Sequence, residues 1–131
     1  MKTQVAIIGA GPAGLLLAQL LRQNAIDCVI LEARSEEYVL NRIRAGVLEH
    51  PTVELLHAIG AGDRLAREGM PHEGIDMVFR GEKRRIDFPA LTGGKKVTVY
   101  GQQEVVKDLI ALKKDFDGQI LFEAENVQLH N

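Results

Sequence analysis

The feature that most constrains this chain is a glycine-rich turn between an apolar run and a run rich in alanine and leucine. Residues 4–8 are apolar and β-branched, which predicts a parallel strand buried on both faces. Residues 13–23 have almost no polar face, which predicts a helix covered on both sides. Between them lie three glycines with the spacing G-x-G-x-x-G: Gly9, Gly11 and Gly14. By itself this spacing is a weak signal, so its context decides its meaning.

The context is a second apolar run at residues 28–31, which ends in Glu32. Asn24 can adopt the left-handed conformation that ends the preceding helix. The elements form a βαβ unit in which the first glycine permits the tight turn, the second lets the backbone approach a pyrophosphate, and the third allows helix and strand to pack closely. Amide groups at the start of the helix then face the phosphate oxygens.

Glu32 indicates which nucleotide this unit binds. A carboxylate at the end of the second strand accepts hydrogen bonds from the ribose hydroxyls of an adenosine, and its charge repels a 2′-phosphate. The nucleotide at this site is therefore FAD or NAD, and not NADP. A plain turn with a solvated glutamate is disfavoured, because several separate features agree.

The rest of the chain alternates short helices and strands. Residues 33–49 read as an irregular stretch, which places Arg34, Arg42 and Arg44 on a loop. The further elements expected are a helix opened by Pro51 and closed by Gly60, a helical turn at 63–68, a hairpin within 72–88 that turns at Gly81-Glu82, a strand at 97–100, a helix at 103–115 and a strand at 119–122. The last strand is expected to be the third of a parallel sheet, so the predicted fold class is α/β.

Composition excludes several classes of protein. A chain of 131 residues fits one domain, and 46% hydrophobic with 26% charged residues is typical of globular proteins. A formal charge of −2 argues against nucleic acid as a partner. No apolar stretch is long enough to cross a bilayer and no basic leader precedes the first strand, so we expect a cytoplasmic protein. Cys28 is expected to be a small buried hydrophobe, and no histidines and carboxylates make a convincing metal set.

Four segments resemble the flavoprotein monooxygenases that hydroxylate aromatic rings. They are residues 9–15, residues 42–49 (Arg-Ile-Arg-Ala-Gly-Val-Leu-Glu), residues 72–74 and residues 97–102. Of these, the segment at 42–49 is the most specific. The resemblance runs along nearly the whole chain but covers about the first third of the family's length. It implies that residues 1–131 are the N-terminal part of an FAD-binding domain, and that the 72–88 hairpin belongs to a substrate-domain sheet.

The resemblance also implies an activity. In the family, NADPH reduces the flavin, and the reduced flavin uses dioxygen to hydroxylate a bound phenolic acid. We therefore expect an FAD-dependent monooxygenase with NADPH or NADH as reductant and 4-hydroxybenzoate, converted to 3,4-dihydroxybenzoate, as substrate. His72 is the one candidate for a proton relay, since its side chain titrates near neutrality. A hydrogen-bonded hairpin histidine is an equally good interpretation.

The residues implied to bind the cofactor fall into two groups. Those of the fingerprint are Gly9, Gly11, Ala13, Gly14 and Glu32, and those of the later segments are Arg42, Ile43, Arg44, Ala45, Gly46, Val47 and Gln102. A guanidinium fork suits a diphosphate through charge-assisted hydrogen bonds.

Two other functions stay open on the sequence alone. One is an NAD-dependent dehydrogenase domain, which shares the fingerprint but does not explain the segment at 42–49. The other is a non-catalytic FAD- or nucleotide-binding module. We expect the chain by itself to show no hydroxylase turnover, to bind FAD weakly or not at all, and to form a homodimer or otherwise self-associate through open sheet edges and an apolar hairpin face.

Overall fold

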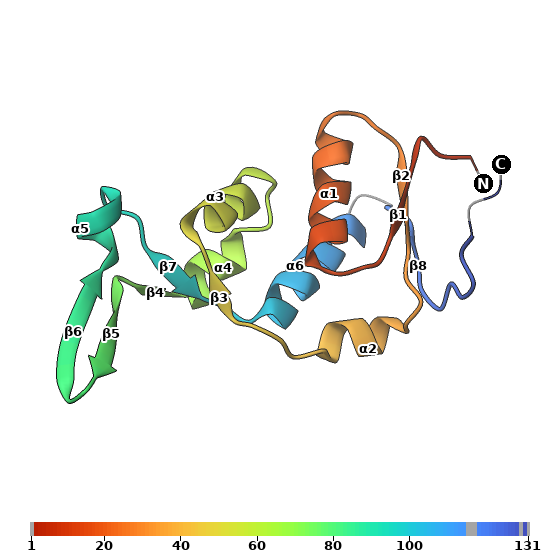
Figure 1. Ribbon diagram of the computed structural model, residues 1–131. Helices are drawn as coiled ribbons and strands as arrows, with labels where there is room; N and C mark the ends of the chain where they lie inside the picture. The colour runs from red at the N-terminus through yellow and green to blue at the C-terminus, as the bar shows by residue number, and fades with distance from the viewer. Residues whose placement is uncertain (1, 115–117, 129, 131) are drawn as a thin grey trace.

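The computed structural model of the chain describes residues 2–114, 118–128 and 130. Three sheets organise it: sheet A with the order β1-β2-β8, sheet B with the order β3-β7-β4, and the hairpin β5-β6 (Figure 1). The strands are β1 (Val5–Ile8), β2 (Cys28–Leu31), β3 (Val47–Leu48), β4 (Met70–His72), β5 (Gly74–Phe79), β6 (Glu82–Asp87), β7 (Val97–Val99) and β8 (Ile120–Leu121). The helices are α1 (Pro12–Gln23), α2 (Glu36–Asn41), α3 (His50–Ala58), α4 (Asp63–Glu68), α5 (Phe88–Thr92) and α6 (Gln102–Lys114).

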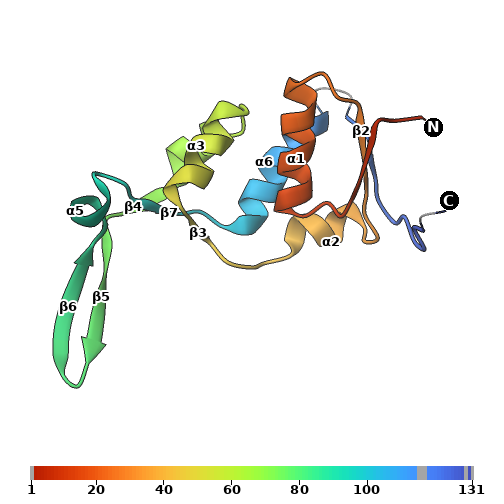
Figure 2. The ribbon, with the colours of Figure 1, turned by 45° about the horizontal axis from the view of Figure 1, so that its top comes forward.

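Sheet A is the predicted parallel sheet. β2 pairs in parallel with β1 on one side and with β8 on the other, which confirms the βαβ unit and the third parallel strand. Helices α1 and α6 pack against each other on one side of this sheet (Figures 1 and 2). The buried core lies between them and the sheet, and includes Ile7, Leu15, Ile30, Val106 and Leu109.

The opposite face of sheet A is open along β1 in the part of the chain that the structure describes. Ile7 is buried, whereas its neighbour Ile8 is 69% exposed. The prediction that the first strand is buried on both faces is therefore wrong here. Helix α1 is likewise covered on one side only, because Leu17 is exposed while Leu15 and Ala18 are buried.

The end of α1 also differs from its prediction. Asn24 has φ −99°, and the residue in the left-handed region is Ala25 with φ 55°. Asn24 instead donates a hydrogen bond from Nδ2 to the Leu20 carbonyl at 2.8 Å. The amide side chain thus satisfies a carbonyl near the helix end, and the chain reverses one residue later.

The stretch at 33–49 is not wholly irregular, because it contains α2. Ser35 caps this helix by accepting a hydrogen bond from the Tyr38 amide at 3.2 Å. Glu36 and Glu37 then occupy the first turn, where acidic residues are favourable. Arg42 and Arg44 follow the helix in non-helical conformation, so their predicted loop placement is confirmed.

Sheet B joins three short segments that are far apart in the sequence. β7 pairs in antiparallel fashion with β3 on one side and with β4 on the other, and only β7 was predicted as a strand. His72 belongs to β4, where it pairs with Val97, rather than to the hairpin.

The hairpin β5-β6 projects from the end of the molecule that is distant from sheet A (Figures 1 and 2). Its two turn residues, Arg80 and Gly81, both have positive φ, of 52° and 82°. This is the pattern of a type I′ turn. The predicted turn at Gly81-Glu82 was one residue late, since Glu82 already pairs with Phe79. Phe88, predicted as a strand residue, begins α5.

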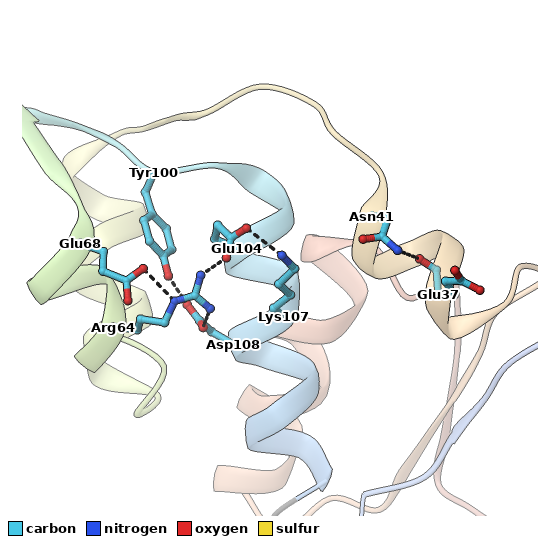
Figure 3. Close-up of polar contacts among 8 residues, drawn as sticks. All are labelled: Glu37, Asn41, Arg64, Glu68, Tyr100, Glu104, Lys107 and Asp108. Carbon is cyan, nitrogen blue, oxygen red and sulfur yellow. Dashed lines mark hydrogen bonds and ion pairs between the residues drawn. The ribbon is translucent and has the colours of Figure 1, made fainter.

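A polar cluster around Arg64 ties α4 to α6 (Figure 3). The Arg64 guanidinium donates to Asp108 at 2.7 Å and to Glu68 at 3.1 Å, and it also donates to Glu104. The Tyr100 hydroxyl donates to the second oxygen of Asp108 at 2.6 Å. Burial and this hydrogen bond raise the pKa of Tyr100. The cluster therefore fixes the start of α6 relative to the end of β7.

Replacing Tyr100 with Phe should destabilise the protein, because it removes a buried hydrogen bond to a carboxylate. We expect Tyr100→Phe to lower the free energy of unfolding by about 1.5 kcal/mol in urea titrations. Tyr38→Phe is the matched control, since Tyr38 is 45% exposed whereas Tyr100 is 5% exposed. The raised pKa adds a pH dependence: the parent should lose stability as pH rises above about 10, and Tyr100→Phe should lose less. Equal stabilities of the two variants would contradict this role.

Candidate functional site

The glycine-rich turn brings β1 and α1 into close contact. Gly9 has φ +107°, a conformation that L side chains rarely adopt, and its amide donates to the Leu31 carbonyl at 2.7 Å. A Cβ atom on Gly14 would lie 2.2 Å from the Gly9 carbonyl oxygen and 3.2 Å from the Ile7 side chain. The third glycine is therefore needed for helix and strand to pack as they do.

Gly11, in contrast, faces open space. Nothing lies within 4 Å of the position that a Cβ would occupy on this residue. Gly11 is the N-cap of α1, and no side chain caps the helix start. The first amide groups of the helix are thus available to an external acceptor, which the helix dipole favours if it is anionic.

Glu32 is held between the two loops that follow β1 and β2. Its Oε2 accepts a hydrogen bond from the Ala10 amide at 2.7 Å, and its Oε1 accepts one from the Arg34 amide at 2.8 Å. These two bonds orient the carboxylate at the carboxyl ends of the parallel strands. Because an ionised carboxylate has about four acceptor positions, Glu32 retains capacity for further donors.

The arginines that follow α2 lie near the same edge. The Tyr38 ring has the Arg34 guanidinium 5.5 Å and the Arg42 guanidinium 5.6 Å from its centre. Among the described residues, Arg44 makes no hydrogen bond or ion pair. Its five donors are therefore open to a ligand.

A cleft of about 140 Å³ joins these groups. Of the predicted cofactor residues, it brings together Gly11, Glu32, Arg42, Arg44 and Gln102, and the rest of its lining is Ala10, Pro12, Tyr38, Val39 and Val106. We refer to it as the nucleotide cleft. Its charged groups are two guanidiniums and one carboxylate, so it combines sites for an anion with a site for hydroxyl donors.

An apolar cavity of about 240 Å³ adjoins the nucleotide cleft. Pro12 and Gln102 line both spaces, and Ala13, Ala45 and Val47 line the apolar one. Backbone hydrogen bonds hold the segment at 45–46 against the start of α6, from the Tyr100 amide to the Gly46 carbonyl at 2.8 Å and from the Gln102 amide to the Ala45 carbonyl at 3.0 Å. Remote parts of the chain are thereby brought to one place.

Other predicted site residues lie outside the two spaces. Ile43 is 79% exposed and lines neither one. Gly46 packs on Gly101, which lies 3.6 Å from its Cβ position. Gly9 and Gly14 shape the turn, and His72 is an exposed residue of sheet B.

The apolar lining was missed by sequence analysis. The cavity is also lined by Leu16 on α1, Leu48 in β3, Thr52 and Leu56 on α3, and Val105 and Leu109 on α6. The signal available was the spacing of Thr52 and Leu56, which places both on one face of a helix. This spacing predicts that one face of the helix is buried, but it does not predict which residues or cavity that face contacts.

Within residues 2–114, 118–128 and 130, no group of three or more histidine, cysteine, aspartate or glutamate side chains is placed to hold a metal ion. Nor is any described helix long and apolar enough to cross a membrane.

Comparison with known proteins identifies the class to which this fold and cleft belong. The chain matches the family described as FAD binding domain over residues 2–131. It belongs to this family, and the family's cofactor is FAD.

Sequence relatives are more specific. The chain is 51% identical, over 131 residues, to p-hydroxybenzoate hydroxylase of Acinetobacter baylyi. The aligned region covers all of this chain and 32% of that protein. It is 36% identical over 74 residues to 3-amino-4-hydroxybenzoate 2-monooxygenase of Streptomyces cremeus, covering 56% of this chain and 18% of that protein. The chain thus spans about a third of the first relative and less of the second.

Solved structures agree with the fold. PqsL of Pseudomonas aeruginosa, solved in complex with 2-aminobenzoylacetate, matches with a TM-score of 0.81 at 19% identity, covering 92% of this chain and 33% of that one. The p-nitrophenol 4-monooxygenase PnpA of Pseudomonas putida matches with a TM-score of 0.76 at 23% identity, covering 90% and 31%. At these identities the likeness establishes the fold.

The residues present fit FAD. A diphosphate would fit the open space at Gly11 and the uncapped start of α1. It would also suit Arg44, which has no partner among the described residues. The adjoining apolar cavity suits a ring system.

Two glycine variants separate folding from binding. We expect Gly14→Ala to lower the free energy of unfolding by about 1–3 kcal/mol, because its Cβ would overlap the Gly9 carbonyl. Gly11→Ala should change stability by less than about 0.5 kcal/mol yet weaken FAD binding, since its Cβ fills the space that faces the cleft. Urea titration and flavin fluorescence measure the two effects. A stable Gly14→Ala protein, or unchanged FAD affinity in Gly11→Ala, would oppose this assignment.

Proposed function

We propose that this chain is the FAD-binding part of an NAD(P)H-dependent flavoprotein monooxygenase that hydroxylates a phenolic acid, with 4-hydroxybenzoate converted to 3,4-dihydroxybenzoate. The observation that carries the proposal is the nucleotide cleft, in which Glu32 and two arginines lie beside an apolar cavity. The substrate is suggested by the 51% identity to p-hydroxybenzoate hydroxylase. Because the chain spans about a third of that relative, the activity belongs to the whole protein.

Each part of the cleft would hold a different part of FAD. Glu32 would accept hydrogen bonds from the ribose hydroxyls of the adenosine. The amides at the start of α1, with Arg42 and Arg44, would bind the diphosphate. Ala13 would lie against the diphosphate, and Ala45, Val47 and Gln102 would lie toward the flavin. The nearby Ile43, Gly46, Gly9 and Gly14 would shape the surrounding backbone.

The bound flavin supplies hydride acceptance from the reductant and activation of dioxygen. The chain's own residues bind and orient it, and the apolar lining excludes water from one side of the site. The charge of Glu32 disfavours a 2′-phosphate in this cleft, so NADPH or NADH would approach elsewhere. A proton relay through His72 remains a prediction, and so does the place of the 72–88 hairpin in a substrate-domain sheet.

Membership of the FAD binding domain family favours a flavoprotein over an NAD-dependent dehydrogenase domain. The alternative of a non-catalytic FAD-binding module differs in one measurable way, because it would not couple reductant consumption to an aromatic acid. We further propose that the protein acts in the cytoplasm.

We refer to Arg42 and Arg44, which would bind the diphosphate, as the arginine clamp. The clamp makes a prediction for Arg44. We expect Arg44→Lys in the complete protein to weaken FAD binding by about 1–2 kcal/mol, since an ammonium lacks the two-pronged fork that a diphosphate accepts. Arg84→Lys on the exposed hairpin is the control and should leave FAD affinity unchanged. The dissociation constants come from quenching of flavin fluorescence. Equal FAD affinity in Arg44→Lys and the parent would count against the clamp.

Catalysis is tested on the complete protein loaded with FAD. 4-Hydroxybenzoate should accelerate NADPH or NADH oxidation and yield 3,4-dihydroxybenzoate in matching amount, measured by chromatography. Residues 1–131 alone should give no turnover. Reductant oxidation that no aromatic acid accelerates would favour the non-catalytic module, and acceleration by a different phenolic acid alone would correct the substrate.

The hairpin makes a prediction about assembly. Ile75, Met77 and Phe79 are each about half exposed or more, and both edges of this two-stranded sheet are open within the described residues. We propose that residues 1–131 self-associate through this face. Sedimentation equilibrium should give a mass above 14.4 kDa for the parent and a lower one for Phe79→Ser. A monomeric parent would refute the proposal.

A further inference from the structure

A second polar cavity lies at the edge of sheet A opposite the nucleotide cleft. Thr3, Asp27 and Gln119 line it, and they lie just before β1, β2 and β8 at the amino ends of the strands. Its volume is about 260 Å³. The nucleotide cleft, in contrast, is formed by Gly11 and Glu32 after the carboxyl ends. The two spaces are therefore separate, and the second is not explained by FAD.

Gln19 is the first unusual group in this cavity. Its side chain is on α1 and is 1% exposed, yet its Nε2 has no hydrogen-bond partner in the described part of the chain. Its Oε1 is already used, since it accepts a hydrogen bond from Arg22 Nε at 3.0 Å. An unpaired buried amide costs about 1–3 kcal/mol, so a missing acceptor is expected beside it.

Lys113 is the second unusual group. It lies in the last turn of α6 and is 5% exposed. Among the described residues, the one polar partner of its Nζ is the Cys28 sulfur at 3.6 Å, and no carboxylate pairs with it. Gly118 packs against the aliphatic part of the Lys113 side chain. A Cβ atom added to Gly118 would lie 2.4 Å from Lys113 Cγ. A buried ammonium is normally paired with an anion, and here the anion is not part of the described chain.

The two groups that lack a suitable partner, the Lys113 ammonium and the Gln19 amide nitrogen, are both hydrogen-bond donors. Lys113 Nζ and Gln19 Nε2 need acceptors, and among the described residues that line the cavity Lys2 is a further cation and Asp27 is the carboxylate. A ligand that complements them carries negative charge and several acceptor oxygens. The volume is below the roughly 300 Å³ at which pockets begin to hold drug-sized molecules, so the ligand is small.

We propose that this cavity is a binding site for a small oxyanion, of the class of inorganic phosphate or sulfate, held by Lys113 and Gln19. The proposal does not depend on the function proposed for the nucleotide cleft. Binding would satisfy two buried donors and would join α1 and α6 behind the amino ends of the strands.

Cys28 reports on this site without any substitution. It lines the same cavity and is the one cysteine of the sequence. A bound oxyanion next to Lys113 should shield the thiol, so inorganic phosphate should slow its alkylation by a neutral reagent in a saturable manner. Sodium chloride at equal pH and ionic strength should not. Equal rates in phosphate and chloride would overturn the proposal.

A pair of neighbouring lysines supplies the second test. Phosphate at ten times its dissociation constant should raise Tm of the parent by about 5 °C. Lys113→Met keeps the apolar stem and should abolish this rise. Lys114→Met should retain it, because Lys114 is exposed and pairs with Glu36 at 2.5 Å. Equal phosphate-induced shifts in both variants would contradict the site, and if Lys113→Met does not fold, Gln19→Leu takes its place with the same expected loss.

Discussion

The whole site depends on the close contact of α1 with β1 at Gly14. Because this residue has no side chain, the helix lies directly on the Gly9 carbonyl, at a position where a Cβ would approach to 2.2 Å. The contact places the start of α1 at the carboxyl end of the sheet, next to Glu32. The Ala10 amide can then reach the Glu32 carboxylate at 2.7 Å, which orients it. One packing constraint thus positions both the uncapped start of α1 and the Glu32 carboxylate.

The remainder of the site comes from later parts of the chain, and two sets of contacts hold them in register. Hydrogen bonds from the Tyr100 amide to the Gly46 carbonyl, and from the Gln102 amide at the start of α6 to the Ala45 carbonyl, keep the arginine segment at the cleft. The Arg64 cluster then fixes α6 through Asp108 and Glu104 (Figure 3). These contacts join segments separated by forty residues or more, so the cleft forms only when the domain has folded.

The sequence predicted the parts of the structure that have a strong local signal. The glycine spacing, Glu32 and the apolar runs gave the βαβ unit, and similarity within residues 42–49 indicated the arginine segment. The missed elements were short: β3 has two residues, too few to show alternation, and β4 contains Pro71, which argues against a strand. The exposure of Ile8 was unpredictable because an apolar run reports hydrophobicity and not what covers it. Side chains such as those of Gln19 and Lys113 are mostly exposed in proteins, so only tertiary contacts reveal that both are buried here.

The central claim is that the cleft around Glu32 binds FAD, and titration of FAD into Glu32→Ala tests it most directly. The substitution removes the carboxylate that the Ala10 and Arg34 amides orient, so the account predicts FAD binding weaker by about 1–3 kcal/mol. Glu37→Ala removes an exposed carboxylate on α2 and should leave the affinity as it is. An FAD dissociation constant in Glu32→Ala equal to that of the parent, with both proteins folded, would contradict the account.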